Sequence, residues 1–244
     1  NYELGLKSEL MDNRLRLNVS IFYLDWENLQ FESFFFLTPG DLSTNFEQFI
    51  NIPKAEGKGF ELEFTALASE SLTISGGLGY LDTEITEQQT VELSGGWRPE
   101  LLGLGLPKAP ELTANLVGEY RWPLGKNEAW VRLEYIHRDG QYSDVEGLTN
   151  LQLNGETPNS IAGGGGQFHF SGPNEFPYLS PDYDLFNLRV GYATDNWSVT
   201  GFIQNLTDEK YYTGTQENFG VNGIRLRPNP RTIGLSFSYS FGDI

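Results

Sequence analysis

The sequence offers few side chains for catalysis. It has no Cys, and only His137 and His169 would titrate near neutral pH. Neither histidine lies in a nucleophile motif, so we expect that the protein is not an enzyme, and we interpret His137 as a strand-end residue. The glycines at 163–166 are not followed by Lys and then Ser or Thr, as a phosphate-binding loop requires. They are interpreted as a loop, and neither a catalytic residue nor a cofactor is predicted.

Two carboxylates have a spacing that invites comparison with a metal site. Asp182 and Asp184 stand two residues apart, but the remaining ligands and the central Gly of an EF-hand calcium loop are missing. We interpret both as turn or capping residues, and no metal site is predicted. The net charge of −17 at pH 7 argues against nucleic acid as a partner, because phosphates require a basic surface.

Binding has better support than catalysis. Aromatic and Arg residues gather in the long segments between regular elements, where they could hold a bulky, anionic or aromatic ligand by stacking and charge-assisted hydrogen bonds. The alternative is that they order the loops and anchor them in lipopolysaccharide. The predicted ligand-binding residues are Trp97, Arg98, Tyr142, Phe168, Tyr178, Tyr212, Arg225 and Arg227.

The elements that position these residues have the pattern of β-strands. Large apolar residues from Ile233 to Phe241 alternate with Thr, Gly and Ser, so a strand here has one apolar face and one small, polar face. The same alternation recurs in four hairpins with short turns. Their strands are expected near 2–10 and 15–23, 60–65 and 72–80, 112–120 and 131–135, and 186–192 and 197–203.

About nine strands therefore predict an all-β, antiparallel fold. The mean hydropathy of −0.37 and the lack of an apolar run near eighteen residues exclude transmembrane helices. A transmembrane β-barrel passes this test, because each of its strands needs only about ten residues that are alternately apolar. The abundant Gly, Phe and Tyr residues, 28, 17 and 12 in number, agree with such a chain.

The connections between the predicted strands alternate between short and long. Long irregular stretches are expected at 28–56, 85–110 and 139–182, and a fourth precedes the last strand. Short turns on one rim and long loops on the other are typical of barrels in the outer membrane of Gram-negative bacteria, so this location is predicted. Bacterial single-chain barrels have even strand numbers, so nine strands are interpreted as part of a wall.

Polar residues recur on the strand faces opposite the apolar rows. In a soluble sheet they would face water, whereas in a barrel they face a wet or plugged lumen. The residues predicted to face the lumen are Arg132, Glu134, Asn187 and Arg189.

Several segments, in this order along almost the whole chain, resemble TonB-dependent outer-membrane receptors. They are Asn1-Tyr-Glu-Leu-Gly-Leu, Asp12-Asn-Arg-Leu-Arg-Leu, Gly59-Phe-Glu-Leu-Glu-Phe, Leu106-Pro-Lys-Ala-Pro, Asn205-Leu-Thr-Asp with Tyr211-Tyr212, and Pro230-Arg-Thr-Ile-Gly-Leu-Ser-Phe-Ser-Tyr-Ser-Phe. The family usually ends on an aromatic residue, whereas Gly242, Asp243 and Ile244 follow here.

The resemblance implies a fold and a function. Such receptors have a 22-stranded barrel plugged by an N-terminal domain, and residues 1–244 would be the C-terminal portion of that barrel, with the plug domain absent. They import scarce ligands with energy passed from the inner membrane, and a ferric siderophore is the expected cargo, with glycan or cobalamin as alternatives. The implied partners are outer-membrane lipid and lipopolysaccharide, an inner-membrane energy-coupling protein that acts through the plug, and a small-molecule ligand such as a metal chelate.

Two other classes of protein remain open from the sequence. One is a small, self-contained diffusion barrel or structural protein of the outer membrane, which an even strand count would support. The other is a secreted β-sandwich that binds glycans. The files of Ser and Gly opposite the aromatic rows are hard to explain in a sandwich.

Overall fold

The computed structural model describes residues 1–36, 45–88, 101–142, 179–218 and 222–241. No helix in these ranges is long and apolar enough to cross a membrane. The strands are β1 (Tyr2–Leu10), β2 (Leu15–Phe36), β3 (Asn45–Leu67), β4 (Leu72–Glu87), β5 (Leu112–Leu124), β6 (Asn127–Arg138), β7 (Gln141–Tyr142), β8 (Leu179–Ser180), β9 (Tyr183–Ala193), β10 (Trp197–Gln204), β11 (Gly214–Asn218), β12 (Asn222–Leu226) and β13 (Thr232–Tyr239).

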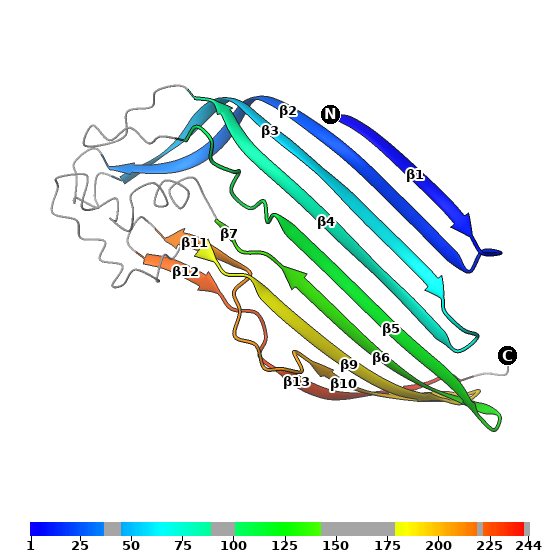
Figure 1. Ribbon diagram of the computed structural model, residues 1–244. Helices are drawn as coiled ribbons and strands as arrows, with labels where there is room; N and C mark the ends of the chain where they lie inside the picture. The colour runs from blue at the N-terminus through cyan, green and yellow to red at the C-terminus, as the bar shows by residue number, and fades with distance from the viewer. Residues whose placement is uncertain (37–44, 89–100, 143–178, 219–221, 242–244) are drawn as a thin grey trace.

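Among the described residues, nine strands form one curled antiparallel sheet (Figure 1). Their order is β1-β2-β3-β4-β5-β6-β9-β10-β13, so each strand pairs with the strands that precede and follow it within this sheet. Two small two-stranded sheets, β7-β8 and β11-β12, complete the described strands. The short turns gather at one end of the large sheet, and β7, β11 and β12 lie beyond the other end. The predicted all-β antiparallel class and the nine strands are confirmed.

The strand register separates the side chains into two faces. One cross-strand row consists of Leu6, Val19, Leu62 and Leu78, and we call the side that carries it the apolar face. It is largely uncovered: Leu4, Ile233 and Leu235 are 70%, 73% and 75% exposed. The polar face is the opposite side, and one of its rows consists of Asn18, Glu63, Gly77 and Asn115. Apolar exposure on this scale marks a surface that meets lipid or protein rather than water.

The short turns are built from residues that accept a left-handed backbone. Met11, Asp12 and Asn13 connect β1 to β2 with φ values of 55°, 54° and 65°. Arg14 then reaches the next turn, where its guanidinium donates hydrogen bonds to the carbonyls of Leu67 and Ala68, each at 3.1 Å. This contact ties the first two turns of the wall together.

The predicted irregular stretch at 28–56 is wrong. β2 and β3 stay paired beyond the neighbouring strands, from Leu29 opposite Ile52 as far as Phe36 opposite Asn45. Asn28 has a φ of 55°, and one left-handed residue changes the face on which the following side chains lie. The apolar alternation therefore breaks at Asn28, although the backbone pairing continues.

The other long stretches also contain more order than predicted. The last of them holds the β11-β12 hairpin, and the one at 139–182 contributes the β7-β8 pair. β4 runs on to Glu87, and a segment that begins at Leu101 follows its edge, with the Ile85 N–H donating to the Leu104 carbonyl at 2.8 Å. This segment closes a small apolar cluster of Leu29, Ile52, Ala55, Ile85 and Leu101.

Candidate ligand path on the polar face

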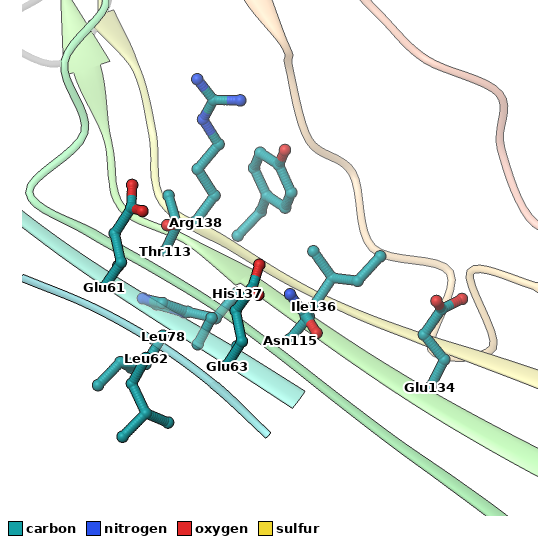
Figure 2. Close-up of a pocket in the computed structure, with 14 residues that line it drawn as sticks. Glu61, Leu62, Glu63, Leu78, Thr113, Asn115, Glu134, Ile136, His137 and Arg138 are labelled. Atoms are coloured by element: carbon teal, nitrogen blue, oxygen red, sulfur yellow. The ribbon is translucent and has the colours of Figure 1, made fainter. Parts of the chain in front are cut away.

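A hollow of about 540 Å³ lies on the polar face toward the end that carries β7, β11 and β12 (Figure 2). Gly77 and Gly79 of β4 line its floor, because at these two positions in the row no side chain fills the space. Glu61 and Glu63 come from β3 and Arg138 comes from β6, with β4 and β5 between these strands. Leu62 and Leu78 point to the opposite side of the sheet.

Two groups of aromatic rings and guanidiniums, linked through the consecutive residues Tyr211 and Tyr212, adjoin this hollow, and we call them together the rim row: Arg138, Tyr183, Tyr211, Tyr212 and Arg227. Arg138 and Tyr183 are directly paired across β6 and β9, and the Tyr183 and Tyr211 ring centroids are 4.6 Å apart. The Arg227 guanidinium lies 5.3 Å from the Tyr212 ring centroid and donates a hydrogen bond to its hydroxyl at 2.9 Å. The row offers planar stacking surfaces next to positive charge.

Arg138 is only partly satisfied by the protein. Its Nη2 donates to Gln141 Oε1 at 3.0 Å, whereas its buried Nε has no partner in the described part of the chain. Tyr211 stays a neutral hydrogen-bond donor at physiological pH, because burial and the nearby Tyr183 raise the pKa of its phenol. Burial likewise raises the pKa of Tyr142. Unpaired guanidinium N–H groups and neutral phenols favour an anionic, aromatic guest.

A hydrogen-bond network fixes the wall below the rim row. Asn187 Nδ2 donates to Glu134 Oε2 at 3.0 Å, and Asn187 Oδ1 accepts the Asn205 backbone N–H at 2.9 Å. The buried Asn205 side chain donates to the Glu209 carbonyl and accepts the Glu209 N–H, at 2.9 and 2.8 Å. Asn205 has a φ of 53°, so its side chain closes a turn whose backbone is left-handed.

We expect Asn205→Ala to lower the free energy of unfolding by about 1–2 kcal/mol, because it removes two side-chain hydrogen bonds and leaves Ala at a positive φ. Thr207→Ala is the matched control, since Thr207 is exposed in the same turn. Denaturant unfolding of both variants measures the difference. Equal stability of Asn205→Ala and the wild type would contradict this role.

A second charged group lies closer to the short turns. Arg121 donates to Glu119 at 2.6 Å and to Glu128 at 2.5 Å, and its guanidinium lies 5.7 Å from the Trp130 ring centroid. Arg132 is 3.8 Å from Glu119, at the outer limit of an ion pair. The group therefore contains four charged side chains, and the Arg121 guanidinium in it lies next to the Trp130 ring.

His137 also lines the hollow, although its register with Ala114 at the end of β6 places it on the apolar face of the sheet. Its Nδ1 lies 2.9 Å from Asp184 Oδ1, and its Nε2 lies 3.2 Å from Asp139 Oδ1. Tyr135 also donates to Asp184, at 2.7 Å. Both ring nitrogens are engaged by carboxylates, which agrees with a strand-end residue. Within the described ranges, no group of three or more His, Asp or Glu side chains is arranged to hold a metal ion.

The structure brings only some of the predicted ligand-binding residues together. Tyr212 and Arg227 contact each other, and Tyr142 lies in β7, where its carbonyl accepts the Lys108 N–H at 2.7 Å. Trp97, Arg98, Phe168 and Tyr178 lie outside the described residues, as does the side chain of Arg225. Arg132 is directly opposite Arg189, and Glu134 is directly opposite Asn187, so all four predicted lumen residues share the polar face.

Sequence reasoning missed Tyr183 and the floor of the hollow. Tyr183 follows Asp182 at a predicted loop end, and only the register with Arg138 makes it part of a site. The hollow depends on Gly77 and Gly79 of β4 together with Thr113 and Asn115 of the adjacent β5. Both features arise from strand pairing, which cannot be predicted from the local sequence.

The family model for TonB dependent receptor-like β-barrels matches residues 1–206. The chain belongs to the TonB-dependent receptors. It is therefore a member of a family of outer-membrane receptors of Gram-negative bacteria, which are transport proteins and not enzymes. The predicted family, location and receptor class are confirmed.

Individual relatives are distant and longer than this chain. The metal-pseudopaline receptor CntO of Pseudomonas aeruginosa is 22% identical over 239 residues, which are 98% of this chain and 27% of CntO. The siderophore receptor PiuA from Acinetobacter baumannii is 20% identical with a TM-score of 0.63, covering 96% of this chain and 27% of PiuA. The ferric yersiniabactin uptake receptor FyuA from Yersinia pestis is 18% identical with a TM-score of 0.66, covering 99% of this chain and 29% of FyuA. The PiuA and FyuA structures share the fold of this chain.

Proposed function

We propose that residues 1–244 form the C-terminal portion of the barrel domain of a receptor that imports a ferric siderophore. Membership of the receptor family supports a role in ligand uptake. The descriptions of PiuA, FyuA and CntO as siderophore or metal-chelate receptors support a metal chelate as the cargo. The chain spans about a quarter of the length of CntO, so the plug domain and the other strands of a 22-stranded barrel would belong to a longer protein.

The observation that carries the proposal is the rim row beside the hollow. Arg138 has a buried Nε without a partner in the described residues, and Tyr183 and Tyr211 form an adjoining pair of rings. A ferric siderophore is bulky and often carries anionic or aromatic groups, so it can stack on the rings while its oxygens accept guanidinium hydrogen bonds.

The mechanism requires capture, closure and passage. In this proposal the rim row and the residues Trp97, Arg98, Phe168, Tyr178 and Arg225 hold the ligand outside. Arg132, Glu134, Asn187 and Arg189 then line the lumen through which it passes once the plug rearranges. An inner-membrane energy-coupling protein acts on that plug, and no covalent bond is made or broken.

The apolar face is the surface that we assign to lipid. Aromatic pairs flank it near both strand ends, such as Tyr192 with Trp197 near a short turn and Phe60 with Tyr80 toward the other end, at 5.5 and 5.8 Å. Such rings suit the two membrane interfaces, and the loops beyond them would meet lipopolysaccharide.

The test uses the full-length receptor in outer membranes of a host that makes no siderophore. Binding of a ferric tris-catecholate, a ferric trihydroxamate and ferric citrate is measured for the wild type and for Arg138→Gln. We expect one chelate to bind, and the variant to bind it roughly tenfold more weakly, the value of one charged hydrogen bond. Lys126→Gln, in an exposed short turn, is the charge-matched control.

Two results would contradict the proposal. The first is that no ferric chelate binds while cobalamin or an oligosaccharide does, which would keep the receptor class and change its cargo. The second is that Arg138→Gln and Lys126→Gln bind the chelate equally well, which would remove the rim row from the site.

A further inference from the structure

A groove of about 650 Å³ lies on the apolar face, in the middle of the wall. It is formed by β4, β5, β6 and β9, and β3 and β10 lie on either side of these four strands, so the chain itself supplies both walls of the groove. The lumen lies on the opposite side of the sheet, out of reach of this groove. Most of the lining side chains are aliphatic or aromatic, and Asp184 is the only charged one among the described residues that line it.

The groove exists because one position on its floor has no side chain. Gly118 of β5 is directly opposite Ile74 of β4 and Leu133 of β6, and no described atom lies within 4 Å of the place that its β-carbon would take. Toward the long loops, Tyr135 and Phe186 are paired across β6 and β9, with ring centroids 5.1 Å apart. Large side chains therefore surround a narrow gap that a flexible hydrocarbon chain can fill with close contacts.

The length of the groove corresponds to one leaflet of a membrane. It runs from Leu72 to Asp184, which belong to cross-strand rows that meet β6 at Val131 and His137. Six residues separate these two rows, which is about 20 Å along the strand. Strands of membrane barrels tilt by about 35–45°, so the groove covers about 15 Å of depth, or half of a hydrocarbon core of about 30 Å.

The polar end of the groove lies at the depth expected for the outer head groups. His137 is ten residues from Asn127, where β6 begins after a short turn, and this is about 33 Å along the strand or about 25 Å in depth. The apolar band of such a barrel is also about 25 Å tall. Asp184, directly opposite His137, is therefore placed where acyl chains join their head groups, toward the long loops.

Asp184 needs hydrogen-bond donors that the described chain supplies only in part. The Tyr135 hydroxyl and His137 Nδ1 both contact its Oδ1, at 2.7 and 2.9 Å, and its Oδ2 accepts no hydrogen bond from the described residues. The side chain is 52% exposed on a face that is otherwise apolar. A carboxylate beside hydrocarbon is costly unless it is hydrogen-bonded. The groove thus suits a hydrocarbon chain with an O–H or N–H group near its head.

We propose that the groove binds one acyl chain of lipopolysaccharide, and that Asp184 accepts a hydrogen bond from a hydroxyl or amide N–H group near the head of that chain. Lipopolysaccharide forms the outer leaflet, on the side of the long loops, and its acyl chains carry both groups, whereas the acyl chains of phospholipids carry neither. This inference rests on the assignment of the apolar face to lipid in the proposed function, but it does not depend on the cargo.

The first experiment measures binding of lipopolysaccharide to the full-length receptor in detergent. A rough lipopolysaccharide with one acylation pattern is titrated, and native mass spectrometry counts the molecules that the wild type, Gly118→Leu and Asp184→Asn retain. We expect the wild type to retain one molecule. Gly118→Leu fills the floor of the groove and Asp184→Asn removes a charged acceptor, so each variant should bind the lipid roughly tenfold more weakly.

Two control variants carry the same substitutions outside the groove. Gly201→Leu adds its side chain on the apolar face of β10, again where no described atom lies within 4 Å of the β-carbon position. Asp12→Asn removes a carboxylate from the exposed turn between β1 and β2. Both controls should bind the lipid as the wild type does. Equal binding by the wild type and all four variants would mean that lipid only surrounds the barrel, and the proposal would be wrong.

A second titration separates lipopolysaccharide from other occupants of the groove. With phosphatidylethanolamine of the same chain length, we expect weaker binding by the wild type and no preference between the two lipids by Asp184→Asn. Equal binding of both lipids by the wild type would overturn the proposed hydrogen bond. A receptor dimer that Gly118→Leu abolishes would assign the groove to a second copy of the protein, which would also overturn the proposal. If Gly118→Leu does not fold, Asp184→Asn and its control decide the outcome.

Chelate binding by the same preparations keeps this inference apart from the proposed cargo. If the receptor binds no ferric chelate but retains the lipid only when Gly118 and Asp184 are intact, the lipid site stands and the iron cargo fails. If a ferric chelate binds while all variants retain the lipid equally, the cargo stands and the lipid site fails.

Discussion

Replacing Leu116 with Arg should destabilise the wall by about 2–4 kcal/mol, the cost of a cationic side chain at the bilayer midplane. Leu116 lies in the middle of β5, opposite Gly76 and Tyr135, and its side chain is 46% exposed on the apolar face. In lipid the charge of the Arg side chain loses its hydration, which destabilises the protein. If the apolar face were exposed to water instead, the charge would stay hydrated and the substitution would have little effect or would stabilise the protein. The measurement is denaturant unfolding of the full-length receptor in lipid vesicles.

Val117→Arg is the matched control for this experiment. It introduces the same side chain one residue later, on the polar face, opposite Ser75 and next to Glu134. We expect its effect on the free energy of unfolding to be below about 1 kcal/mol, as for lumen-facing sites that remain hydrated. Equal effects of the two variants would contradict the assignment of the apolar face to lipid.

Gly191→Leu should cost about 3 kcal/mol, at the upper end for overpacking a filled site. Gly191 is directly opposite Trp130, and a β-carbon on Gly191 would overlap the indole ring. Trp130 also carries the Arg121 guanidinium above its ring, so the indole cannot swing away without breaking this contact. Urea unfolding, with Trp fluorescence as a second probe of the ring, measures the cost.

Two variants show whether this cost is steric. Gly118→Ala adds a β-carbon where no atom lies within 4 Å, and it should leave stability nearly unchanged. Trp130→Ala combined with Gly191→Leu should recover part of the loss, because the added side chain can occupy the space of the indole. A double variant that is less stable than the sum of both single changes would contradict the overlap.

Most of the wall could be predicted from residue alternation alone. Period-two patterns located the nine strands, and their short turns fell at one end, because a half-apolar strand must keep its register to keep its faces. Ile233 and Leu235 on β13 illustrate this, since a shift by one residue would bury Gly234 and Ser236 in the apolar face instead.

The candidate site was less predictable, for two physical reasons. A single left-handed residue such as Asn28 or Asn205 changes the direction of the chain without a periodic signal. In addition, the rim row and the opposition of Arg132 and Arg189 depend on which residues meet across strands, and the 44 residues between Arg138 and Tyr183 carry no signal of this pairing. Arg132 and Arg189 were each expected on the lumen side, but their direct opposition emerges only from the register.

The strand order has a consequence for how the wall is made. Every strand of the large sheet pairs with the strands that precede and follow it in that sheet, and no connection crosses another strand. A chain of this kind can be assembled one hairpin at a time, because each new hairpin needs only the edge that the previous one left free. The entropy cost of closing a loop is small for hairpins with short turns. It is largest for the pairing of β6 with β9, because the longest connection lies between these two strands. Biogenesis should therefore pause at this junction.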